Sequence, residues 1–179
     1  MVYLDDVLVY SKSENIHCDH VQCVLTCLHE NNLHVNPEKS LFHTNSIEFL
    51  GSMMSLKGIV MDSAKTEAIG RWPTPSSVKQ VQSFIGFTNF YCHFIVNFSE
   101  TITPLTCLTQ KDTRFSWGPE HQQAFDTLKL AFTQAPVLTH FDPVNLIVME
   151  MDASDYAITP ITSQISPEDS NLHLIAFYS

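Results

Sequence analysis

The sequence has 179 residues, 44% of them hydrophobic, and nineteen Asp and Glu against nine Lys and Arg give a formal net charge of −10. This composition excludes a disordered chain, and no apolar run is long enough to predict a membrane span. Five Cys without a CxxC pair indicate free thiols rather than a disulfide framework. The amino terminus lacks a signal-peptide pattern, so we expect an intracellular protein, cytoplasmic or nuclear and not secreted.

The first half of the chain predicts a hairpin, a helix and a second hairpin. Residues 2–10 alternate as two short strands around an acidic turn. Apolar residues then recur at three- and four-residue spacing from about Glu14 to Asn31, which predicts a helix. After Pro37, the stretch SIEFLGSMMSLKGIVMD predicts a hairpin with Lys57 and Gly58 in its turn.

Two further helices are expected in the middle of the chain. The segment Trp72-Pro73-Thr74-Pro75 breaks the chain, and a helix starts near Ser76 or Ser77. A connecting region rich in Thr and Pro follows. Pro119 suits the first turn of the next helix, which runs from His121 to Gln134.

The carboxyl-terminal segment predicts three strands. Leu146–Met151 and Leu172–Tyr178 are strongly apolar, and residues 157–165 form a third candidate between them. Because the connections are short, we expect a three-stranded antiparallel meander. Pro160 lacks an amide proton, so the middle strand should be irregular there or turn that position away from a partner.

Two adjacent carboxylates lie in the first predicted hairpin. Asp5 and Asp6 repel each other, and divalent cations that bind carboxylate oxygens would relieve this repulsion. Two-metal phosphoryl transfer uses such a pair. A solvated Asp-Asp turn is the commoner explanation for an isolated pair of this kind.

The surrounding motifs favour the first explanation. YLDDVLVYS is similar to the YxDD signature of reverse transcriptases. It is followed in order by NPEKSLF, IEFLG, GIVMDSAKTEAI, WPTPSSVKQVQSFIGFTNFY, FSWGPEHQQAFDTLK, APVL and MDASDY. This series resembles the polymerase of gypsy-type LTR retrotransposons along essentially the whole chain.

The resemblance implies an α+β chain in four parts. Residues 1–73 would form a partial reverse transcriptase palm, residues 74–110 a helical thumb and residues 111–144 a connection. Residues 145–179 would form the first strands of an RNase H-like sheet.

The resemblance also implies site residues. Asp5 and Asp6 would be catalytic and would bind Mg²⁺, and Asp152 matches the first catalytic carboxylate of RNase H. Phe49, Leu50 and Gly51 match the hairpin that positions the primer end. The residues of the thumb helix that would track a nucleic-acid duplex are Ser83, Gly86 and Asn89.

Both active sites are expected to be incomplete. The family has a further palm carboxylate upstream of YxDD and further RNase H residues downstream, so we expect a decayed or domesticated fragment that is inactive alone. The alternatives are a repurposed non-catalytic binding protein and a segment of a larger working polymerase. Cys92 and His93 stand where the family usually has two basic residues, so binding to an RNA or DNA template-primer is expected to be weak.

Two further clusters of side chains each allow a functional and a structural explanation. His20, Cys23 and Cys27 share helical spacing, but zinc generally takes four ligands from two elements, so buried thiols and surface imidazoles are favoured over a metal site. Six aromatic residues between positions 84 and 98 could stack on bases, but their spacing favours a core: Phe84, Phe87, Phe90, Tyr91, Phe94 and Phe98.

Overall fold

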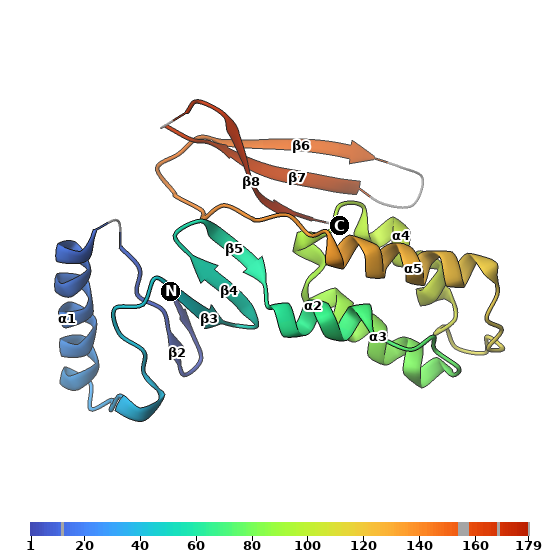
Figure 1. The fold of residues 1–179 in the computed structure, drawn as a ribbon, viewed down its shortest axis with the longest axis horizontal. Coiled ribbons are helices and arrows are strands. Elements are labelled where there is room, and N and C mark those ends of the chain that lie inside the picture. The colour runs from blue at the N-terminus through green and yellow to red at the C-terminus, as the bar shows by residue number, and fades with distance from the viewer. Residues whose placement is uncertain (12, 154–157, 168, 179) are drawn as a thin grey trace.

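The computed structural model describes residues 1–11, 13–153, 158–167 and 169–178. Its α1 helix (Glu14–Glu30) lies at one end of the long axis and a group of helices lies at the other, with small antiparallel sheets between and beside them (Figure 1). The predicted α+β class is therefore confirmed.

The amino-terminal hairpin and helix are confirmed. β1 (Val2–Tyr3) and β2 (Asp6–Val7) pair antiparallel, with Tyr3 opposite Asp6. The helix α1, which the structure describes in full, buries none of its residues. The hairpin and α1 therefore contribute little to the hydrophobic core.

The central sheet has one strand more than predicted. After the short 3-10 helix η1 (Pro37–Lys39), the strands β3 (Ser46–Phe49), β4 (Ser52–Ser55) and β5 (Gly58–Met61) form an antiparallel meander. Gly58 opens β5 and so lies one position past the turn in which it was expected. The extra hairpin was missed because Leu50 is not a typical turn residue.

The hydrophobic core lies among the helices. α2 (Ser63–Gly70), α3 (Val78–Phe90), the short η2 (Cys92–Phe94), α4 (Phe98–Cys107) and α5 (Pro119–Thr133) follow in order. The most deeply buried large side chains of the chain's described parts include Phe84, Phe94, Phe125, Phe132, Ile69 and Leu105. No helix in the described ranges is long and apolar enough to cross a membrane.

The helix α4 lies within the predicted helical thumb, in a segment described from the sequence only as a connecting region rich in Thr and Pro. Its Thr and Pro content is typical of a loop, and Pro104 lies inside it. However, Phe98, Ile102 and Leu105 recur at helical spacing and are all buried. Burial of this apolar face outweighs the low helix propensity of Thr and the hydrogen bond that Pro104 cannot donate.

The carboxyl-terminal meander is confirmed. β6 (Ile147–Ala153), β7 (Ile158–Ile165) and β8 (Leu172–Phe177) pair antiparallel in that order. The carbonyl of Pro160 accepts a hydrogen bond from the amide of Tyr178, so its backbone faces the β8 side. Its missing N–H therefore leaves the β6–β7 ladder intact, and the register shift lies further along β7, between Thr162 and Ser163.

One segment ties the sheets together. Leu138 exchanges two backbone hydrogen bonds with Ile59 of β5, at 2.7 and 2.9 Å. The next residue, Thr139, donates its amide proton to the carbonyl of Leu174 in β8. The central sheet is thus held at its β5 edge by the chain that leads from α5 to the carboxyl-terminal sheet.

Candidate nucleic-acid interface

The turn between β3 and β4 has an unusual backbone. Leu50 and Gly51 both adopt left-handed conformations, with φ of 51° and 73°, while Phe49 is buried and Ser52 pairs with it. A left-handed backbone is easy for Gly and costs a bulky residue such as Leu roughly 1–2 kcal/mol. Strain of this kind persists only where surrounding contacts enforce it.

Tyr91 supplies such a contact. It follows α3 directly, and its side-chain hydroxyl donates a 3.3 Å hydrogen bond to the carbonyl of Gly51, forty residues away in sequence. A Cβ at Gly51 would lie 2.7 Å from that hydroxyl oxygen, so any larger residue there requires the hydroxyl to shift. Burial raises the pKa of the Tyr91 hydroxyl, and the carboxylates of Asp62 and Glu48 raise it further, which keeps the donor protonated.

The outer face of α3 carries the residues that the sequence assigned to nucleic acid. Ser83, Gly86 and Asn89 are all exposed, whereas Val81, Phe84 and Thr88 of the same helix are buried. A Cβ at Gly86 would meet nothing within 4 Å. The helix therefore presents a small-residue gap in the middle of a free face.

Phe90 continues this face and corrects one prediction. It was assigned to the core with five neighbouring aromatics, but 56% of its surface is exposed. Its position, seven residues after Ser83 and four after Gly86, places it on the outer face of α3. Its ring lies edge-on to Tyr91 with centroids 4.9 Å apart. The core assignment holds for Phe84, Tyr91, Phe94 and Phe98, which are buried.

The two residues after Tyr91 add no positive charge at neutral pH. Burial raises the pKa of the Cys92 thiol and lowers the pKa of the His93 imidazole. Both side chains are therefore neutral near pH 7. Neither replaces the phosphate contact that a basic side chain would make there.

Asp5 and Asp6 lie at the tip of the first hairpin. Asp5 occupies the turn beside Leu4, whose φ is 50°, and Asp6 begins β2; both carboxylates are exposed. Carboxylate oxygens suit Mg²⁺, which proteins hold through one or two carboxylates together with water and phosphate oxygens. The described residues contain no group of three potential metal ligands, and Asp5 and Asp6 are the pair to which the resemblance assigns Mg²⁺.

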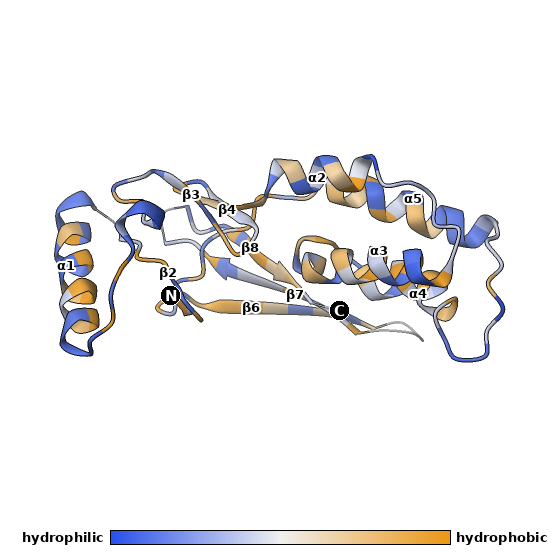
Figure 2. Cartoon of the chain, turned by 90° about the horizontal axis from the view of Figure 1, so that it is seen from below, coloured by the Kyte–Doolittle hydropathy of each residue, from blue (hydrophilic) through white to orange (hydrophobic). Residues whose placement is uncertain are grey.

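Asp152 is separate from this pair. It is the penultimate residue of β6, is exposed, and stands opposite Thr159 of β7. The carboxyl end of β6 points along the molecule toward the group of helices, away from the first hairpin (Figures 1 and 2). The structure does not bring Asp152 together with Asp5 and Asp6, and Asp155 lies outside the described residues.

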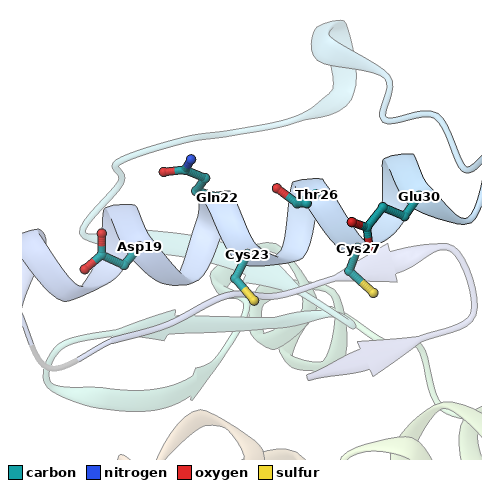
Figure 3. Close-up of a pocket in the computed structure, with 6 residues that line it drawn as sticks. All are labelled: Asp19, Gln22, Cys23, Thr26, Cys27 and Glu30. Carbon is teal, nitrogen blue, oxygen red and sulfur yellow. The ribbon is translucent and has the colours of Figure 1, made fainter.

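Two thiols of α1 share one exposed face of the helix. Cys23 and Cys27 lie on successive turns of one helix face beside a shallow, open depression (Figure 3). The other side chains that line it are Asp19, Gln22, Thr26 and Glu30. His20 instead hydrogen-bonds to Ser11 at 2.8 Å. Both thiols are exposed, whereas the sequence predicted buried thiols.

Comparison with known proteins agrees with the motif series. Residues 1–54 match the family model described as reverse transcriptase (RNA-dependent DNA polymerase). Residues 117–179 match the model described as an RNase H-like domain found in reverse transcriptase. The chain is 36% identical over 177 residues to the Transposon Tf2-3 polyprotein of Schizosaccharomyces pombe, and 35% identical to the Tf2-7 polyprotein.

The chain belongs to the gypsy-like retrotransposon polyproteins. It corresponds to a reverse transcriptase segment that continues into an RNase H-like domain. The match covers 99% of this chain and 13% of each of those polyproteins, so the chain spans about an eighth of their length.

Solved structures support the same assignment. The retrotransposon segment superposes on a foamy viral protease-reverse transcriptase in complex with an RNA/DNA hybrid, with a TM-score of 0.80 and 26% identity. This match covers 99% of the segment and 24% of the viral chain. A second foamy viral structure, in complex with double-stranded DNA, gives a TM-score of 0.76 at 25% identity, covering 94% of the segment and 30% of that chain.

Two aromatic residues of the retrotransposon segment make contacts that the sequence does not predict. Tyr91 is buried as predicted, but its hydrogen bond to Gly51 was not predicted, and neither was the position of Phe90 beside the Leu50–Gly51 turn. The signal that could have separated Phe90 is its helical register with Gly86. No pattern in the sequence points to the contact between Tyr91 and Gly51, because it depends on the tertiary placement of α3.

Proposed function

We propose that this segment holds a template-primer duplex for a reverse transcriptase and does not polymerise DNA by itself. In this proposal Phe49, Leu50 and Gly51 position the primer end. The duplex runs along the outer face of α3, which carries Ser83, Gly86 and Asn89.

The observation that carries the proposal is the meeting of these two surfaces. The β3–β4 turn and α3 are contributed by distant parts of the sequence, and Tyr91 joins them through a hydrogen bond to Gly51. Beside this joint, α3 exposes Phe90 and the open gap at Gly86. A gap without a side chain allows a nucleic-acid backbone to approach the helix closely.

The catalytic part of the proposal concerns three carboxylates. Asp5 and Asp6 would supply oxygen ligands to Mg²⁺ during phosphoryl transfer, and Asp152 would do so in an RNase H-like site. Among the described residues neither place gathers three ligands. Both activities would therefore need carboxylates from other parts of a longer polyprotein.

A primer-extension assay tests this part. The purified 179-residue chain is incubated with an RNA template, a DNA primer, nucleotides, and either Mg²⁺ or Mn²⁺. We expect no extension above background, because this chain supplies two palm carboxylates where the resemblance implies a two-metal site built from three. The matched control is Asp5→Asn. Extension by the natural sequence that disappears in Asp5→Asn would contradict the proposed lack of activity.

A further inference from the structure

The Leu50–Gly51 turn needs an external support, because its own sequence does not favour its conformation. Leu50 lies in the left-handed region, which the typical Asn-Gly or Gly-Gly turn would enter without strain. Within the β3–β4 hairpin, the pairing of Phe49 with Ser52 closes the turn. This pairing does not fix the position of the turn relative to α3.

Tyr91 meets the turn from the side of α3. Its side chain is 4% exposed and packs between Phe87 and Phe90, with ring centroids 5.6 and 4.9 Å away. With the ring held in this way, the hydroxyl points toward the carbonyl of Gly51 and donates its hydrogen bond to it. The position for a Cβ on Gly51 is 3.5 Å from the edge of the Phe90 ring, so the turn lies beside both aromatic residues.

We propose that Tyr91 is a positioning residue that fixes the primer-positioning turn against the duplex-binding face of α3. This inference rests on the proposed function. The hydroxyl of Tyr91 does not touch the nucleic acid. It acts by fixing the distance between the β3–β4 turn and the outer face of α3. A duplex can then bind to both surfaces without the entropic cost of ordering them.

The contact itself is tested in the free chain with a double-mutant cycle. Gly51→Ala places a methyl group 2.7 Å from the Tyr91 hydroxyl and also strains a backbone at φ 73°. Tyr91→Phe removes the oxygen, and the next atoms from the new methyl group then lie at 3.5 and 3.6 Å. We expect Gly51→Ala to lower the melting temperature less in the Tyr91→Phe background than in the natural one. If the melting-temperature changes of the two single variants add up to that of the double variant, the proposed contact is overturned.

The positioning role is tested by duplex binding at low salt. A fluorescent RNA/DNA hybrid is titrated with the natural chain, Tyr91→Phe, and two controls. Loss of a typical hydrogen bond corresponds to roughly a two- to tenfold change, so we expect Tyr91→Phe to weaken binding by about that factor. Thr88→Val removes another buried hydroxyl from α3, bonded to the carbonyls of Phe84 and Ile85 and away from the turn. It should leave the affinity unchanged. Tyr10→Phe, on an exposed ring, should also bind normally.

The outcomes separate this inference from the proposed function. A natural chain that does not bind the hybrid at all would overturn both. Binding that is equally strong in Tyr91→Phe would overturn the positioning role alone. An equal loss in Thr88→Val would also overturn it, because general loosening of α3 would then explain the effect.

Discussion

Gly86 is a residue whose identity the fold does not explain. It lies in the middle of α3, where Gly destabilises a helix by about 0.5–1 kcal/mol relative to Ala. Nothing stands within 4 Å of its missing Cβ, so close packing inside the protein does not require it. A ligand that approaches the helix backbone would supply the missing reason.

Replacement of Gly86 by Ala should therefore separate stability from binding. We expect Gly86→Ala to raise the free energy of unfolding by about 0.5–1 kcal/mol, measured by urea denaturation, and to weaken binding of an RNA/DNA hybrid. Gly70→Ala is the matched control, because Gly70 ends α2 and also has open space around it. A Gly86→Ala variant that is more stable and binds with unchanged affinity would show that the gap has no role in binding.

Cys92 and His93 set the electrostatics of the same region. Because both are neutral near pH 7, they offer no positive charge to a phosphate, and the chain as a whole carries a formal charge of −10. Binding should then be no tighter than the ~10⁻⁴ to 10⁻⁶ M of non-specific contacts at physiological salt.

A single added charge tests this explanation. Cys92→Arg should tighten binding of the hybrid and steepen the log–log salt dependence by about one unit, because one more phosphate is neutralised. Cys107→Arg adds the same charge to an exposed position on α4 and should change the slope less. Equal slopes for the two variants, or sub-micromolar binding by the natural chain, would reveal a basic surface elsewhere.

At the scale of elements, helices and strands with a regular apolar pattern were predictable from the sequence. Helices that depend on tertiary packing were not. The apolar spacing of α3 and α5 and the β-rich runs of β6 and β8 carry strong local signals, and all four elements were predicted. The helix α4 was missed because Thr and Pro lower its local propensity, and only its packing against α5 and α3 makes it form. The short α2 was missed as well; its Asp62 cap and the fully buried Ile69 are the features that stabilise it.

In the candidate site, too, local features were predictable from the sequence and tertiary contacts were not. Asp5, Asp6 and the exposed face of α3 can be read from motifs and helical register within one segment. The joint between Tyr91 and Gly51 cannot, because it spans forty residues and depends on where α3 is placed against the central sheet. The turn itself is also hard to predict, because Leu50 adopts a left-handed conformation and the sequence has no typical turn residue before Gly51.

At the scale of the whole molecule, the carboxyl-terminal sheet ends in an open strand. β6 pairs with β7, and no other strand of the described residues lies at its outer side. The backbone of Pro160 faces β8, so Met151, which stands opposite it, directs its own N–H and C=O outward. By alternation, Ile147 and Met149 do the same. Their side chains are 48–73% exposed, and Figure 2 shows the hydrophobic colour along β6.

Such an edge predicts salt-dependent self-association. Unpaired backbone groups beside apolar side chains are a template for strand pairing between molecules. At low ionic strength the net charge of −10 keeps copies apart, and salt screens this repulsion while leaving backbone hydrogen bonds in place. Sedimentation velocity should therefore show larger species as NaCl rises from about 0.05 to 0.5 M, a range over which the Debye length falls well below 10 Å.

Two proline variants identify the strand responsible. Met149→Pro removes a donor that points outward, so it should suppress the salt-dependent association while the β6–β7 ladder persists. Val148→Pro, one residue earlier, removes a donor that points toward Ser163 of β7 and should lower the melting temperature substantially more. If Met149→Pro associates like the natural chain, the contact lies elsewhere. If the natural chain stays monomeric at high salt, the exposed acidic side chains Glu150 and Asp152 are sufficient to protect the edge.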